Sequence, residues 1–151
     1  MSDITLKPVN ISKNDKYSEY KISLIHDHDP KIQLKKVTKP LSRFLNEEIR
    51  NKHGITVNIT LKINFTKPGG DDSQTAYFKS KAQAITHENE TIETLKNIGN
   101  ELLNKIAGWI SQGSGWVIEK VKDHRITIIK YKPLRGSSYL PLPEAIKIGR
   151  D

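Results

Sequence analysis

The chain has 151 residues, no cysteine, and 25 lysines and arginines against 17 aspartates and glutamates, a formal net charge of +8. This length suits a single domain with a sizeable core, and the missing cysteines exclude disulfides, thiol catalysis and thiolate metal sites. No apolar run reaches the roughly 18 residues of a membrane helix, and the N-terminus lacks a signal-peptide core. We therefore expect an intracellular protein of the cytoplasm or nucleus. The cationic surplus favours nucleic acid as a partner, although a basic domain can also be merely soluble.

The first part of the chain predicts a loose arm followed by one strand. Residues 1–16 are polar with scattered apolar positions, which predicts a flexible N-terminal arm. Residues 17–25 alternate between apolar and polar side chains, as in a strand with one buried face. Pro30 lies beyond the end of this strand, because proline cannot donate to a sheet ladder.

The middle of the chain predicts a helix and then a long hairpin. Residues 41–52 carry an apolar stripe at helical spacing, and Pro40 suits the first turn of that helix. Residues 55–66 alternate strictly, which predicts an antiparallel strand with one buried face and one wet face. A Gly-rich turn at residues 68–73 leads into a returning strand over residues 75–85.

The last part of the chain predicts a long helix and a second hairpin. Residues 91–111 carry an apolar stripe, and Gly113 can end that helix. Residues 116–121 and 125–132 predict two strands joined by a turn at residues 122–124.

Together these elements predict an α+β fold: an antiparallel sheet of two hairpins plus an N-terminal strand, with two helices packed on one face. The order of elements lacks the strand–helix–strand regularity of a parallel sheet. We place a single domain over residues 17–143, between the arm and a C-terminal tail at residues 144–151.

The segment from Gly113 to Pro143 has the most distinctive sequence, GSGWVIEKVKDHRITIIKYKPLRGSSYLPLP. It resembles a block found ahead of a protein-primed family B DNA polymerase or a nuclease-like region in Maverick/Polinton transposons and related eukaryotic DNA viruses. The resemblance implies a role in the replication of a mobile element or virus. It carries over no polymerase or nuclease residue, and the block itself has no activity attached to it.

Two basic regions provide the candidate nucleic-acid site. Lysines and arginines can neutralise phosphates, tyrosine rings can stack on bases, and hydroxyls can hydrogen-bond phosphate oxygens. The C-terminal candidates are Lys120, Arg125, Lys130, Tyr131, Lys132, Arg135, Ser137, Ser138 and Tyr139. The long hairpin adds Lys62, Lys79 and Lys81, with Tyr77 available for stacking. An ordinary solvated basic face is the alternative interpretation of both regions.

Two other functions stay open. Trp109, Trp116 and the tail at residues 140–143 could anchor a protein partner in a viral replication or packaging assembly. A metal-dependent nuclease could hold its ion with His26, Asp27 and His28, if a third ligand came from elsewhere in the chain. These residues could equally be no more than the polar end of a strand.

The sequence shows no phosphate-binding loop, nucleophile elbow or zinc-protease motif. We therefore expect a binding domain rather than an enzyme, without catalytic residues, cofactor or resident metal. Its expected partner is nucleic acid, DNA before RNA, bound through phosphates with help from aromatic stacking. An element-encoded replication protein is a further candidate partner, and a membrane is not expected.

Overall fold

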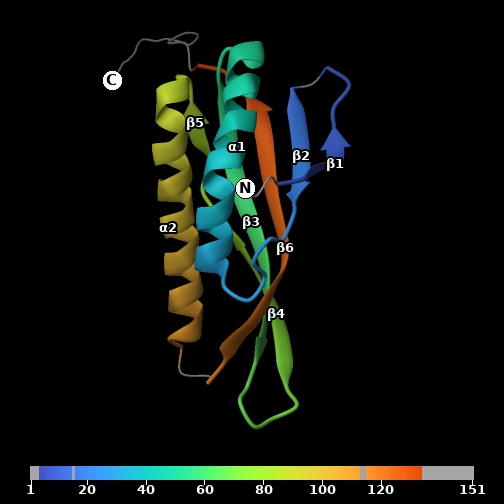
Figure 1. Ribbon diagram of the computed structural model, residues 1–151, viewed down its shortest axis with the longest axis vertical. Helices are drawn as coiled ribbons and strands as arrows, with labels where there is room; N and C mark the ends of the chain where they lie inside the picture. The colour runs from blue at the N-terminus through green and yellow to red at the C-terminus, as the bar shows by residue number, and fades with distance from the viewer. Residues whose placement is uncertain (1–3, 15, 113–114, 134–151) are drawn as a thin grey trace, which may run out of the picture.

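The computed structural model describes residues 4–14, 16–112 and 115–133 and shows one antiparallel sheet backed by two helices (Figure 1). From edge to edge the sheet contains β1 (Leu6–Ile11), β2 (Tyr17–Ile22), β6 (Val117–Lys130), β3 (Ile55–Thr66) and β4 (Ser73–Lys79), and β5 (Gln83–Ile85) also pairs with β3. Helices α1 (Pro30–Lys52) and α2 (Thr91–Ile110) pack against each other on one face, with a short 3₁₀ helix, Glu88–Glu90, ahead of α2. The predicted α+β fold is confirmed. The described residues leave the other face of the sheet open, and we call it the open face.

The core lies between the sheet and the two helices. Every second residue of β3, from Ile55 to Phe65, is buried against the helices, and the residues between them lie on the open face. The helices close the core with apolar side chains such as Leu41 and Leu102, both almost fully buried. Burial of one such side chain contributes about 1.5–3 kcal/mol, so the strict alternation of β3 fixes which face of the sheet the helices cover.

The prediction of a loose arm is wrong for residues 6–11, which form β1. This strand pairs antiparallel with β2, from Leu6 opposite Ile22 to Ile11 opposite Ser18. Pro8 and a register shift between Pro8 and Asn10 break the alternation that would have marked a strand. An edge strand tolerates both features, because one of its sides has no partner strand.

Helix α1 begins at Pro30, not at residue 41 as predicted. Asp29 caps it, since its Oδ1 accepts a hydrogen bond of 2.9 Å from the backbone N–H of Lys31. Pro40 lies inside the helix, where proline normally costs stability because it lacks an N–H donor. Packing compensates here, because Leu34 and Val37 are buried in the core ahead of Pro40.

The predicted second hairpin is wrong, because residues 117–130 form the single strand β6. The supposed turn lies within the strand: His124 is buried opposite Leu61, and Asp123 lies opposite Lys62 on the open face. A register shift at Lys62/Ile63 accommodates Lys122 as an extra residue. The strand pairs with β2 on one side and β3 on the other, so it is the central strand of the sheet.

The first predicted hairpin is present, but its returning strand is split into β4 and β5. Ser80 lies in the interruption and ties it to β3, since its N–H donates to the carbonyl of Ile59 and its hydroxyl accepts from the N–H of Ile59, both at 2.9 Å. The helix predicted over residues 91–111 is confirmed as α2. Its predicted stop, Gly113, lies outside the described residues, as does the predicted domain boundary at residue 143.

Candidate nucleic-acid interface

The strand register brings several predicted cations together on the open face. One cross-strand row contains Lys21, Arg125, Thr60 and Lys79, from β2, β6, β3 and β4. The next row contains Asp123, Lys62 and Tyr77, and Lys120 lies further along β6, opposite Asn64. Of the hairpin residues predicted for the site, only Lys62, Lys79 and Tyr77 are therefore placed on the open face by the register.

The other predicted residues lie elsewhere. Lys81 lies beside α2, and its backbone N–H donates to the carboxylate of Glu101 at 2.8 Å. Lys130, Tyr131 and Lys132 lie at the end of β6, where the N–H of Tyr131 donates to the carbonyl of Gly54. Arg135, Ser137, Ser138 and Tyr139 lie outside the described residues. The structure thus divides the predicted site among the open face, the α2 side and the end of the sheet.

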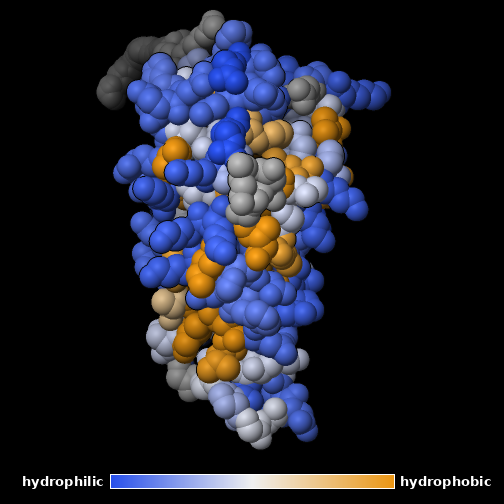
Figure 2. Space-filling model, in the orientation of Figure 1, coloured by the Kyte–Doolittle hydropathy of each residue, from blue (hydrophilic) through white to orange (hydrophobic). Residues whose placement is uncertain are grey.

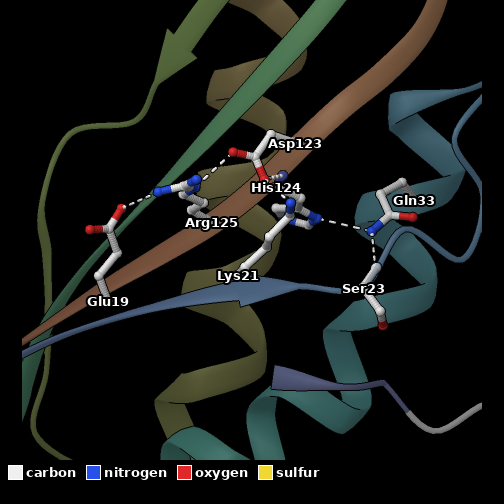
Figure 3. Close-up of polar contacts among 7 residues, drawn as sticks. All are labelled: Glu19, Lys21, Ser23, Gln33, Asp123, His124 and Arg125. Atoms are coloured by element: carbon white, nitrogen blue, oxygen red, sulfur yellow. Dashed lines mark hydrogen bonds and ion pairs between the residues drawn. The ribbon is translucent and has the colours of Figure 1, made fainter. Parts of the chain in front are cut away.

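Arg125 is not a free cation, because it lies in an ion-pair network on the open face (Figure 3). Its Nε donates to Oδ2 of Asp123 at 2.7 Å, and its Nη1 lies 3.5 Å from Oε2 of Glu19. Lys21 adds a contact of 3.8 Å between its Nζ and Oδ1 of Asp123. The hydrogen bond to Asp123, with the charges of both carboxylates, raises the pKa of Arg125. Two carboxylates balance two cations here, so the network is a poor site for a phosphate alone.

A buried junction lies behind this network, on the helix side of β6 (Figure 3). Nδ1 of His124 lies 3.0 Å from Nε2 of Gln33, a residue near the start of α1. The same amide donates to the carbonyl of Ser23, and its Oε1 accepts from the N–H groups of Ile25 and His26, all at 2.9 Å. Because an amide nitrogen can only donate, Nδ1 accepts and His124 is neutral. The junction ties the start of α1 to β6 and to the segment after β2.

Burial lowers the pKa of His124 to about 4, with the charge of Asp123 opposing the shift. The Nε2 of this ring is buried without a hydrogen-bond partner within the described part of the chain. An imidazole that is enclosed and neutral cannot exchange protons with a substrate at the surface. We therefore interpret His124 as a structural residue that positions α1.

A row of exposed cations lies on α1, mostly ahead of residue 41, where the sequence analysis predicted no helix. Lys31, Lys35, Lys39 and Arg43 recur every four residues, so they form one row along the helix surface, with Lys36 beside it. All five side chains are exposed. Among the described residues, none of them makes an ion pair or a side-chain hydrogen bond. We call these five residues the α1 cation row, and at about 1.5 Å per residue it spans about 18 Å.

The α1 cation row opposes the stability of its own helix. Like charges four residues apart destabilise a helix by about 0.2–0.5 kcal/mol per pair, and cations near a helix N-terminus oppose the macrodipole. No carboxylate occurs in α1 before Glu47 to offset them. Figure 2 shows the helix side of the molecule, where strongly hydrophilic residues lie on both sides of a band of hydrophobic ones. A bound polyanion would relieve this repulsion.

The residues of the two alternative functions are placed as follows. His28 Nε2 lies 3.6 Å from Oδ1 of Asp27, and across residues 4–14, 16–112 and 115–133 no three His, Asp or Glu side chains are grouped to hold a metal ion. Trp109 stacks on Phe65 at 4.1 Å between ring centroids, with Trp116 at 6.4 Å from Trp109. Both indoles are partly buried against the core, so only part of each is open to a partner.

Comparison with known proteins finds no match to this chain among family models, curated proteins or solved structures. No helix in the described part of the chain is long and apolar enough to cross a membrane.

The sequence did carry a signal for the α1 cation row. Asp29 followed by Pro30 is an N-cap followed by a first-turn proline, which marks a helix start at residue 30. From that start, the basic residues fall on the outward face opposite Leu34 and Val37.

Proposed function

We propose that this domain binds nucleic acid through the phosphate backbone, with the α1 cation row as the main contact. The observation that supports this is the row itself: five exposed cations without a partner in the described part of the chain, on one helix whose position the Gln33–His124 junction fixes. Duplex DNA carries one negative charge per about 1.7 Å of its axis, so a row of about 18 Å faces many phosphates at once. Lys130 and Lys132 at the end of the sheet add positive potential.

An anionic membrane fits this surface less well. A helix that binds in a bilayer interface inserts an apolar face into the lipid. The apolar face of α1 is already used, since Leu34, Val37, Leu41 and Leu45 are buried in the core. The outward face therefore offers charge without an apolar anchor, which favours a phosphate polymer.

We further propose that the bound polymer is DNA and that the binding serves the replication of a mobile element or virus. The support is the resemblance of residues 113–143 to the block in Maverick/Polinton transposons and related viruses. This segment includes β6, the central strand of the sheet. Contacts to phosphates carry little sequence information, so the row predicts binding of low sequence specificity.

Fluorescence anisotropy with a labelled DNA duplex at several salt concentrations tests the proposal. The triple variant Lys31→Gln, Lys35→Gln and Lys39→Gln should weaken binding equally for unrelated sequences and reduce the salt slope by roughly 3. Glutamine is a good helix former, so α1 should persist, which circular dichroism would check.

The matched control removes the same charge elsewhere, by replacing the exposed Lys7, Lys13 and Lys16 with glutamine. This variant should bind with a slope close to that of the wild type. Equal slopes for both triple variants would show that the α1 cation row is not the phosphate contact, and absence of binding at low salt would refute the proposed function itself.

A further inference from the structure

The open face of the sheet contains a concavity of about 320 Å³ that the phosphate-binding proposal does not use. Its lining comes from four neighbouring strands and consists of Glu19, Thr60, Lys62, Tyr77, Asp123 and Arg125. The strands fix the positions of these side chains, and the α1 cation row lies on the other side of the sheet. The concavity is therefore a separate surface with a different composition.

Donors and acceptors lie side by side in this concavity. Arg125 uses Nε and Nη1 for Asp123 and Glu19, so its Nη2 has no hydrogen bond within the described residues. Oε1 of Glu19 and the hydroxyl of Thr60 are also without a partner there. The carboxylates repel a phosphate, whereas a planar group with its own donors and acceptors can satisfy both kinds of atom.

Tyr77 gives the concavity an exposed aromatic wall. Its side chain is 67% exposed, the largest fraction among the exposed large apolar residues, and Nζ of Lys62 lies 5.6 Å from its ring centroid. An exposed ring on a sheet surface with lysines around it is the arrangement on which single-stranded nucleic acids stack their bases. Lys79, in the adjoining row, can contact a phosphate that flanks such a base.

We propose that this concavity receives one unstacked base of a single-stranded nucleic acid, and that guanine fits it best. The Watson–Crick edge of guanine carries two adjacent N–H donors beside a carbonyl oxygen. The carboxylate of Glu19 can accept from the two donors, and Arg125 or Lys62 can donate to the carbonyl, while Tyr77 stacks on the ring. Thymine offers one N–H between two carbonyls, so it leaves part of the carboxylate unmatched.

The test compares short single-stranded DNAs that differ only at one central base in a thymidine background. Anisotropy at one salt concentration should show roughly tenfold tighter binding for central guanine than for central thymine. The variant Tyr77→Ala should lose roughly tenfold in affinity for every strand, and Tyr77→Phe should retain most of it. Because Tyr77 is exposed, neither change is expected to affect folding.

Glu19→Gln provides the base-specific readout. It should abolish the preference for guanine without weakening the thymine strand, because an amide cannot accept two parallel N–H bonds on one edge. Glu93→Gln is the matched control, since Glu93 is an exposed carboxylate on α2. A photoreactive 4-thiothymidine next to the guanine should crosslink to β4 rather than to α1.

The two proposals can fail separately. Equal affinity for all central bases, unchanged by Tyr77→Ala and Glu19→Gln, would overturn the base site even if the α1 cation row still set the salt slope. Loss of the guanine preference on Glu19→Gln with an unchanged salt slope for the row variants would support the base site alone. If the concavity instead binds basic side chains of a protein partner, the 4-thiothymidine strand should give no crosslink to β4. That result would also overturn the proposal.

Discussion

Acidification should destabilise this domain through His124, and the size of the effect follows from its burial. The ring is fully enclosed, and desolvation lowers its pKa from an ordinary 6.5 to about 4. The unfolded chain therefore binds a proton between these values that the folded chain excludes. Because the folded pKa of a base is depressed, the full stability is present above pH 6.5 and is lost as the pH falls through this window. The total loss is roughly 3 kcal/mol, of which about 2 kcal/mol falls between pH 7.5 and pH 5.

Urea denaturation at pH 7.5, 6 and 5 would measure this loss, with the variant His124→Leu for comparison. The variant should be less stable at pH 7.5 by about 1–2 kcal/mol, since Gln33 loses one hydrogen-bond partner, but it should lack the His124 component of the slope. His87→Gln is the control, because His87 is exposed ahead of α2, and it should keep the wild-type slope. An equal slope in His124→Leu, or a flat wild-type curve between pH 7.5 and 5, would refute the assignment of a buried neutral histidine.

Two further predictions concern the packing that positions both surfaces. Leu61→Ala, at a fully buried position of β3, should cost about 2–5 kcal/mol in urea denaturation, and a loss below 1 kcal/mol would contradict the placement of the core. Gly99→Ala should raise the melting temperature by an amount equivalent to about 0.5–1 kcal/mol, because the added Cβ would meet only Leu34 at 3.9 Å. Gly54→Ala should lower it, because Gly54 has φ of +114° and its Cβ would lie 3.2 Å from Tyr131; the same sign for both glycines would contradict this reasoning.

Local patterns predicted the elements whose burial follows a simple period. Residues 55–66 alternate without interruption because one face of β3 contacts the helices and the other is wet. Residues 91–110 keep an apolar stripe because α2 lies on the sheet along its length. The start of α1 was missed because Pro30 and Pro40 both suit a first turn. Only Asp29 ahead of Pro30 provides a capping side chain, which Lys39 ahead of Pro40 cannot do.

The candidate sites depended on pairings that no local pattern encodes. The charges at residues 122–125 have the composition of a turn, but the central position of β6 makes them part of a strand with one open face. Glu19 meets Arg125 only because β2 pairs with β6 in a register that places Lys21 opposite Arg125. The concavity on the open face follows from this register, so sequence reasoning could name Arg125 but could not assign its partners.

The net charge of +8 predicted a polyanionic partner but could not locate it, because a sum ignores which charges are paired. On the open face, Asp123 and Glu19 offset Arg125 and Lys21, so a cation there loses its carboxylate partner before it can bind a phosphate. On α1 no such cost arises, and binding relieves the repulsion within the row. Removing the charge of Arg125 should therefore change the salt slope less than removing that of Lys35, although both residues count equally in the net charge.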